Sequence, residues 1–283
     1  MFIIDAEEKR MDLKFSVLMS IYIKEKPEYA RACFESLEKQ TLQADEWVIV
    51  EDGPLTEELY FLLDEYQKKY PSIIKRVSLK ENRGLGLALR EGMLQCSNEL
   101  VARMDTDDIC RKDRFEKQVK EFTLDSNLDI CGSHILEFEG EENNIVAKRT
   151  VPLSDAEIKK YQKKRDGFNH VAVMFKKSAV LKAGNYQSCL LMEDTYLWAN
   201  MFLSGAKAKN IDDYLVYVRV GEDMFERRGG FSYFKKYKIG RKQVYKTGFI
   251  SWTDYMYTLI IQFIVALMPN KLRGWVFTTL LHK

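Results

Sequence analysis

The sequence lacks a strong net charge, a cysteine pattern and a signal segment, and each absence argues against a class of protein. Its 44 lysines and arginines nearly balance 42 aspartates and glutamates, which argues against a general nucleic-acid-binding surface. Its five cysteines are scattered and never spaced C-x-x-C, which fits a reducing compartment better than a disulfide framework or a zinc site. Residues 1–12 carry acidic side chains and no apolar core, so no signal peptide is predicted.

Two common nucleotide-binding signatures are also missing. Gly84 and Gly86 begin an apparent G-x-G-x-x-G fingerprint, but Leu89 occupies the third glycine position. No G-x-x-x-x-G-K-[ST] sequence occurs, so neither a dinucleotide fingerprint nor a P-loop is supported. The two glycines are explained more simply by a turn and the entry to a helix.

The chain up to residue 104 alternates between short apolar runs and amphipathic stretches. A chain of 283 residues can hold one large domain, or a domain with an appendage. This alternation is typical of a parallel, doubly wound α/β sheet, in which ligands bind at the carboxyl ends of the strands. The expected strands are 15–22, 46–50, 74–79 and 100–104, and the expected helices are 27–40, 57–70 and 85–96.

The second half is less regular. The charged segment 148–165 has no clear apolar period, and we expect it to form a mobile cover over the site. Residues 139–144 form a polar turn or loop. The further elements expected are helices at 114–122, 177–183 and 192–205, and strands at 128–131, 134–139, 169–175 and 212–220.

Three carboxylates follow the strand at 100–104 within four residues. Asp105, Asp107 and Asp108 repel one another unless a cation or several donors neutralise them. Carboxylate oxygens of this kind suit magnesium or manganese, which bind through one or two carboxylates and substrate phosphates. Helix capping by Asp107 or Asp108 is the alternative, but it accounts for one aspartate more easily than for three.

Polar side chains also follow the three preceding strands. Ser20 and Tyr22 end the first strand, Glu51 and Asp52 end the second, and residues 82–84, with Arg83 at their centre, end the third. Since the carboxyl ends of parallel strands meet at one edge of a sheet, these groups are expected to line one crevice with the aspartates.

The C-terminal segment differs in composition from the rest. Aromatic and basic residues interleave over 231–246, and 255–268 is almost wholly apolar. The apolar stretch is shorter than the roughly 20 residues needed to cross a bilayer. It is equally compatible with lying in an anionic membrane interface and with packing on the domain. Stacking of single-stranded nucleic acid is a weaker alternative for a near-neutral chain.

At these positions the chain resembles the family 2 glycosyltransferases, more closely the bacterial members that build capsular polysaccharides and exopolysaccharides. The resemblance runs from about residue 15 to 220 and rests on five motifs in order: 17–22, 51–53, 82–85, 104–109 and 193–194. It implies an α/β nucleotide-binding fold of the GT-A type, with a mostly parallel central sheet flanked by helices. We expect a catalytic domain at 13–225 and a basic, aromatic helical tail at 226–283.

The resemblance also implies roles in donor binding. Asp52 matches the aspartate that bonds the nucleotide base, most often uracil, and Ser20 and Tyr22 line the base pocket. Glu51 stands where the family often has aspartate, and Arg83 matches a basic position near the nucleotide. The pair Asp105 and Asp107 matches the D-x-D motif. Asp107 then ligates manganese or magnesium at the diphosphate, Asp105 contacts the ribose or the metal, and Asp108 is a cap or a supporting group.

For catalysis, the resemblance makes Asp194 the base, and helix capping by the same residue is compatible with that role. It implies an inverting transfer of a sugar from a nucleotide-diphosphate donor, a UDP-sugar, to a hydroxyl of a growing glycan. Glu193, His170, Arg227 and Arg228 are further candidates for substrate contact, with a structural histidine and a basic linker as the plain alternatives.

The expected acceptor is a glycan linked to polyprenyl diphosphate, and the expected location is cytoplasmic, peripheral on the inner face of the membrane. A sugar-phosphate nucleotidyltransferase is one alternative, although it normally has a glycine-rich loop after the first strand and residues 21–27 contain no glycine. A non-catalytic membrane-associated scaffold is the other, and it leaves the carboxylates unexplained.

Overall fold

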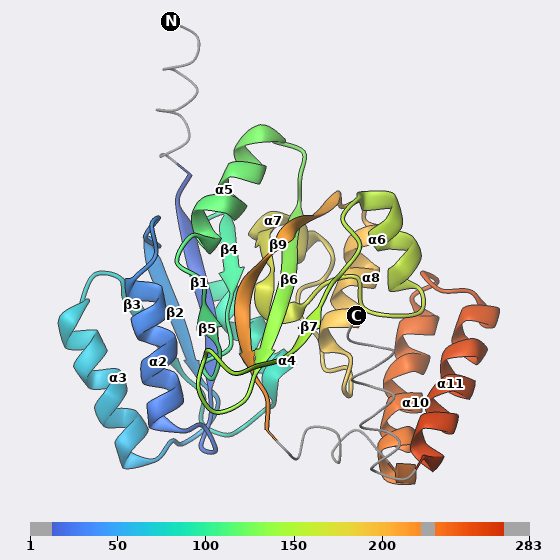
Figure 1. Ribbon diagram of the computed structural model, residues 1–283, viewed down its shortest axis with the longest axis horizontal. Helices are drawn as coiled ribbons and strands as arrows, with labels where there is room; N and C mark the ends of the chain where they lie inside the picture. The colour runs from blue at the N-terminus through green and yellow to red at the C-terminus, as the bar shows by residue number, and fades with distance from the viewer. Residues whose placement is uncertain (1–12, 222–229, 269–283) are drawn as a thin grey trace, which may run out of the picture.

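The first half of the chain forms the expected parallel sheet (Figure 1). The computed structural model describes residues 13–221 and 230–268. Its first four strands are neighbours in the order β3-β2-β1-β4, and all are parallel. They are β1 (Phe15–Ile21), β2 (Glu46–Glu51), β3 (Ile74–Ser78) and β4 (Leu100–Arg103).

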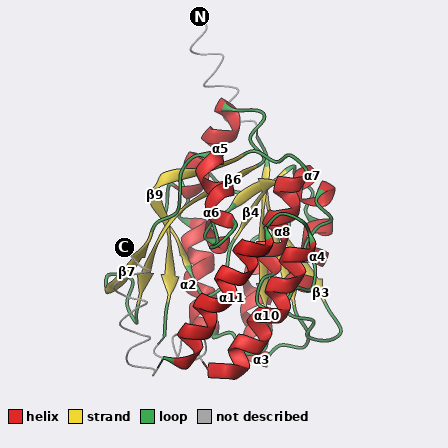
Figure 2. Ribbon diagram, turned by 90° about the vertical axis from the view of Figure 1, so that its right-hand side faces the viewer, coloured by secondary structure: helices red, strands yellow, loops and turns green. Residues whose placement is uncertain are grey.

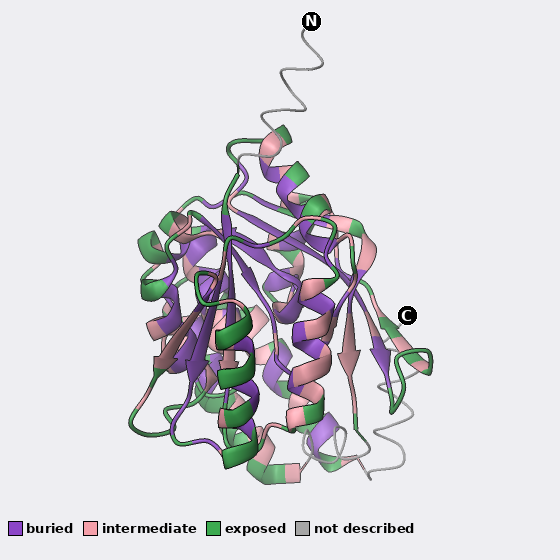
Figure 3. Ribbon diagram, turned by 90° about the vertical axis from the view of Figure 1, so that its left-hand side faces the viewer, coloured by how far each residue is buried: buried purple, intermediate pink, exposed green. Residues whose placement is uncertain are grey.

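Helices cover both faces of this sheet, which explains why its strands are apolar on both sides. Successive strand residues point to opposite faces, so Val17 and Met19 join one core while Leu18 joins the other. The first core contains α2 (Pro27–Glu38) and α3 (Glu57–Lys69), and the second contains α4 (Leu85–Gln95). Strands β1, β2 and β4 are mostly buried, drawn in purple in Figure 3, whereas the edge strand β3 is only partly buried. Burial on both faces is the usual state of parallel sheets.

The second half adds antiparallel strands to the same sheet. Its central strand is β6 (Ile130–Phe138), which pairs antiparallel with β7 (Ile145–Arg149) and β8 (Met174–Lys176) and parallel with β9 (Ala208–Arg219). The short strand β5 (Ile109–Cys110) pairs antiparallel with β9, and α5 (Arg114–Leu124) follows it. Parallel pairing therefore dominates the first half of the sheet, and the second half is mixed.

Two predictions for strands in the second half were wrong. The strands expected at 128–131 and 134–139 are one strand, β6. The strand expected at 169–175 is a 3₁₀ turn, η2 (His170–Ala172), followed by the short β8, because a buried apolar run does not by itself specify a strand.

The charged segment 148–165, expected as a mobile cover, contains α6 (Asp155–Gln162). Its Ser154 and Glu157 form a capping box, whose S-x-x-E signature the sequence carries. Its Ile158 lies fully buried in the core on the α4 side of the sheet.

Two C-terminal helices pack side by side against the rest of the molecule (Figure 2). They are α10 (Gly230–Lys246) and α11 (Trp252–Leu267), and α10 contacts α8 (Glu193–Leu203), which follows α7 (Lys177–Lys182). Val244 and Ile250 join Met192 and Ala199 in a small core. The described helices of the tail, α10 and α11, therefore pack on the domain.

The helix pair is fixed by a buried arginine. Arg241 of α10 donates from Nε to Thr258 Oγ1 of α11 at 3.1 Å, and its guanidinium also donates to the carbonyl of Lys163. The opposite side of α11 leaves large apolar side chains exposed, among them Trp252, Ile260 and Ile264. Within 13–221 and 230–268, no helix is both long and apolar enough to cross a bilayer.

Candidate active site

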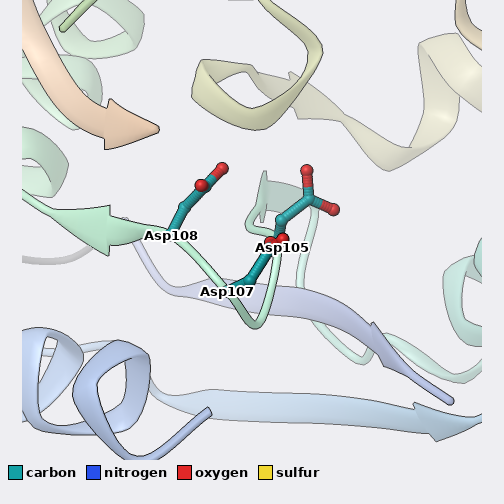
Figure 4. A group of neighbouring side chains, drawn as sticks. All are labelled: Asp105, Asp107 and Asp108. Carbon is teal, nitrogen blue, oxygen red and sulfur yellow. The ribbon is translucent and has the colours of Figure 1, made fainter. Parts of the chain in front are cut away.

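The three predicted aspartates gather on the loop between β4 and β5 (Figure 4). One carboxylate oxygen from each of Asp105, Asp107 and Asp108 lies within 4.8 Å of the others. Asp108 is buried, and the backbone N–H of Arg219 on β9 donates to its Oδ1 at 2.8 Å. The loop is thus held between the parallel half of the sheet and its last long strand.

Arg103 orients Asp105, and the sequence analysis missed it. Its guanidinium donates to both oxygens of Asp105, with Nη1 at 2.6 Å from Oδ2. The side chain is only 2% exposed, and its Nε is a buried donor without a partner. The signal was present in the sequence, because an arginine inside an apolar strand requires a partner for its charge.

The cluster carries more negative charge than its protein neighbours neutralise. Burial, followed by the charges of Asp105 and Glu25, raises the pKa of Asp107 to about 7. Burial, Asp107 and Asp105 likewise raise the pKa of Asp108 well above its usual range. Grouped oxygen donors with unfavourable mutual repulsion fit a hard divalent cation. The residues present therefore suit magnesium or manganese, with Asp105 and Asp107 as the expected ligands.

A cavity of about 380 Å³, which we call the base cavity, brings together most of the residues predicted to bind the nucleotide. Ser20, Tyr22 and Asp52 line it together with Asp105 and Asp107. Glu25 also lines it and accepts a 2.7 Å hydrogen bond from Thr106 Oγ1. Glu25 was not predicted, because only the fold brings the β1–α2 connection to the aspartate loop.

Asp52 organises one wall of the base cavity. Its carboxylate accepts the backbone N–H groups of Arg83 at 2.7 Å and Gly84 at 3.0 Å, which ties the loop after β3 to the end of β2. Each carboxylate oxygen offers two acceptor positions, so the group can still accept a further donor.

Arg83 and Glu51, which were also predicted to bind the nucleotide, are not among the residues that line the base cavity. The Arg83 side chain is exposed and lies 3.7 Å from Glu91. Glu51 is buried and accepts from Arg76 and from Ser78 Oγ on β3. A direct contact of either residue with the donor stays a prediction.

A second cavity of about 720 Å³, the central cavity, lies beyond the aspartates. Its lining includes Arg103, Asp105, Asp108, His170 and Glu193. The His170 ring nitrogen Nε2 lies 2.8 Å from the hydroxyl oxygen of Tyr186, and burial lowers the His170 pKa well below its usual range. Burial also raises the pKa of Glu193. His170 is thus a neutral, hydrogen-bonded group at neutral pH.

Asp194 lines a third, adjoining cavity of about 420 Å³, the hairpin cavity, which lies against α10 and α11. The central and hairpin cavities share Arg149, Leu191 and Tyr233, so the cavity that Asp194 lines adjoins the one that Asp105 and Asp108 line. Arg227 and Arg228 lie outside the described residues, as does the proposed boundary between 225 and 226.

The electrostatics of Asp194 depend on a second carboxylate, Asp166, which no sequence motif singles out. Burial, then Asp166 and Glu193, raises the pKa of Asp194 to about 8. Asp166 lies in the same cavity and accepts from Thr195 Oγ1 at 2.5 Å and from Gln162 Nε2 at 3.1 Å. Two carboxylates 28 positions apart carry no spacing signal, so only the fold reveals the pair.

We expect Asp166→Asn to move the acidic limb of the pH–rate profile to lower pH. A base acts when deprotonated, so kcat/KM should rise with pH as Asp194 ionises. Removing the Asp166 charge lowers the pKa of Asp194, since a like charge disfavours ionisation. The measurement is kcat/KM from pH 5 to 9, with Glu141→Gln in the exposed β6–β7 turn as the control. An acidic limb that stays in place would show that Asp166 does not act on the base.

The family follows from comparison with known proteins. The profile described as Glycosyl transferase family 2 matches residues 16–183, more than half of the chain. The chain belongs to glycosyl transferase family 2. This glycosyltransferase is 45% identical over 271 residues to an uncharacterized glycosyltransferase of Haemophilus influenzae, which covers 96% of this chain and 100% of the relative.

Two further relatives have more specific names. The amylovoran biosynthesis glycosyltransferase AmsE of Erwinia amylovora is 40% identical, covering 93% of this chain and 97% of AmsE. The UDP-Gal:alpha-D-GlcNAc-diphosphoundecaprenol beta-1,3-galactosyltransferase of Escherichia coli is 36% identical, covering 95% of this chain and 97% of the relative.

Solved structures support the fold. The mannosyltransferase PcManGT of Pyrobaculum calidifontis, in complex with GDP-Man and Mn²⁺, superposes with a TM-score of 0.62 at 13% identity, over 96% of this chain and 79% of that one. TarS 1-349 of S. aureus, in complex with UDP-GlcNAc, gives 0.61 at 18% identity, over 81% and 66%. The α/β fold of the GT-A type is therefore confirmed.

Proposed function

We propose that this glycosyltransferase moves a sugar from a UDP-sugar to a hydroxyl of a lipid-linked glycan, with inversion at the anomeric carbon, during synthesis of a bacterial surface polysaccharide. The observation that carries the proposal is the aspartate cluster. It lies where the base cavity and the central cavity meet, because Asp105 lines both. A donor can thus place its base beside Asp52, its diphosphate at the cluster and its sugar in the central cavity.

Each group of residues then has a task. Asp52, Ser20 and Tyr22 hold the base, and Arg103, which donates to both oxygens of Asp105, fixes that carboxylate at the edge of the base cavity. A divalent cation, when bound, offsets the negative charge that develops on the departing nucleoside diphosphate. Asp194 accepts the proton of the acceptor hydroxyl as that oxygen attacks the anomeric carbon from the face opposite the diphosphate.

The relatives support the class of substrates. One relative is named for transfer from UDP-Gal to a diphosphoundecaprenol-linked sugar, and another for amylovoran biosynthesis. The family assignment favours a transferase over a sugar-phosphate nucleotidyltransferase and over a scaffold. The apolar side chains exposed along α11 support a place at the membrane surface, where a lipid-linked acceptor resides.

We expect UDP to protect the chain against heat only when a divalent cation is present. Ligand at a hundred times its Kd stabilises the folded state by about 2.7 kcal/mol, which raises the melting temperature by several degrees. The measurement is a thermal melt with UDP and Mn²⁺, with UDP and a chelator, and with GDP and Mn²⁺. Equal protection by GDP would contradict the choice of uracil, and protection that survives the chelator would contradict the role of the cluster.

A further inference from the structure

We propose that the hairpin cavity binds the diphosphate and the adjoining lipid segment of the acceptor. This inference rests on the proposed function, because it gives the lipid-linked acceptor a place on this chain. The cavity has two chemically different walls. One is basic and comes from the end of β7 and the segment after α6, and the other is apolar and comes from α11. The catalytic candidate Asp194 lies in the same cavity.

The basic wall suits a diphosphate. Arg149, Lys164 and Arg165 line the cavity. Arg241 also lines it, and its guanidinium donates to Thr258 and to the Lys163 carbonyl. Against these four cations stand two carboxylates, Asp166 and Asp194. Four cationic side chains against two carboxylates leave the lining with an excess of positive charge. Charge-assisted hydrogen bonds from arginine and lysine are the usual means of holding phosphate oxygens.

The apolar wall suits an isoprenoid chain. Tyr257, Ile261 and Val265 follow one another at a spacing of four residues on α11, so they form a single stripe on that helix, and all three line the cavity. Ile261 is 45% exposed, so apolar surface there remains open to a ligand. Lys164 Nζ lies 4.9 Å from the centre of the Tyr257 ring, which joins the basic wall directly to this stripe.

The place of the cavity agrees with the order of groups in such an acceptor. A lipid-linked sugar carries its hydroxyl on the side of the diphosphate away from the lipid. The hairpin cavity presents Asp194 for that hydroxyl and shares Arg149, Leu191 and Tyr233 with the central cavity, in which the proposed function places the donor sugar. One continuous path thus leads from the apolar stripe on α11, past the cations, to the base and the donor.

Binding of farnesyl diphosphate to the full-length chain tests this proposal. The titration is carried out by calorimetry with UDP and Mn²⁺ at saturation, so that the nucleotide site is filled. Lys164→Gln is expected to weaken binding roughly tenfold or more, since hydrogen bonds to charged groups contribute at that level. Ile261→Asn is expected to weaken it by about tenfold through loss of apolar contact.

Each variant has a matched control. Lys160→Gln changes an exposed lysine on α6, four residues before Lys164, and Ile260→Asn changes the exposed isoleucine next to Ile261 on α11. Within the described residues, neither Lys160 nor Ile260 lines the cavity. Both controls should bind as the unaltered chain does. Inorganic diphosphate should respond to Lys164→Gln and be insensitive to Ile261→Asn.

The proposal is overturned if the unaltered chain does not bind farnesyl diphosphate, or if both variants bind as tightly as their controls. If only Lys164→Gln weakens binding, the assignment of the lipid segment to α11 is overturned. If only Ile261→Asn weakens binding, the assignment of the diphosphate to the basic wall is overturned. Protection by UDP is measured separately, so failure of the nucleotide site and failure of the acceptor site give different results. If UDP protects the chain but farnesyl diphosphate does not bind, the proposed function stands and the acceptor site proposed here is overturned.

Discussion

Replacing Asp194 with asparagine is expected to remove most sugar transfer while leaving donor binding nearly unchanged. Asparagine keeps the shape of the side chain and can still accept the 2.7 Å hydrogen bond from the backbone N–H of Thr195, so helix α8 should begin as before. What it loses is the ability to accept a proton. A positioned general base contributes roughly 10²–10⁴-fold, so turnover should fall by a factor in that range.

The measurement is UDP release on addition of acceptor, alongside UDP affinity by calorimetry. Glu193→Gln is the informative comparison, because Glu193 precedes Asp194 but lines the central cavity rather than the hairpin cavity. If Glu193→Gln suffers the larger loss of turnover, the two carboxylates have exchanged roles. An equal loss of donor affinity and turnover in Asp194→Asn would show that the residue holds the donor.

Replacing Asp107 with asparagine is expected to abolish the metal-dependent response to UDP and to reduce turnover by roughly 10²–10³-fold. A bound cation supplies several kcal/mol of charge stabilisation in the transition state, and each 1.36 kcal/mol is about a factor of ten in rate. Asp107 is one of three carboxylates whose oxygens lie within reach of a single cation. The substitution removes one negatively charged ligand and therefore weakens cation binding directly.

The same substitution should not unfold the protein. Removing one of three clustered carboxylates relieves repulsion, so without metal the Asp107→Asn chain should melt at an equal or higher temperature than the unaltered chain. The thermal melt with and without Mn²⁺ and UDP therefore separates loss of the ion from loss of the fold. Part of the activity should return at high Mn²⁺ concentration. Full UDP protection in Asp107→Asn would remove this residue from the ion site.

The first half of the fold was predictable because local and global signals agree there. Strands β1, β2 and β4 are short, mostly apolar segments bounded by turn residues, and Pro27 and Thr56 mark the starts of α2 and α3. The structure differs from the prediction where burial is decided by distant contacts. Residues 169–175 are apolar because they are buried, yet η2 turns there before β8 begins.

The site residues divide in the same way, into those that the sequence predicts from strand ends and those that only the fold brings to the site. The aspartates, Ser20, Tyr22 and Asp52 follow strand ends, and parallel strands bring their ends together whatever the rest of the chain does. Glu25 and Asp166 reach the cavities from connections, and Arg149 from the end of β7, at positions that no local pattern specifies. Arg103 differs from these, because its charge within a strand was visible and only its partner, Asp105, explains it.

The buried Arg241 has a consequence for shortened forms of the enzyme. A chain cut after Arg228 would leave the Lys163 carbonyl without its guanidinium donor and would uncover Met192 and Ala199. Such a fragment would differ from the parent in solubility and folding as well as in any affinity for lipid. Point changes on the outward side of α11, such as at Trp252, alter that affinity without opening the seam between the helix pair and α8.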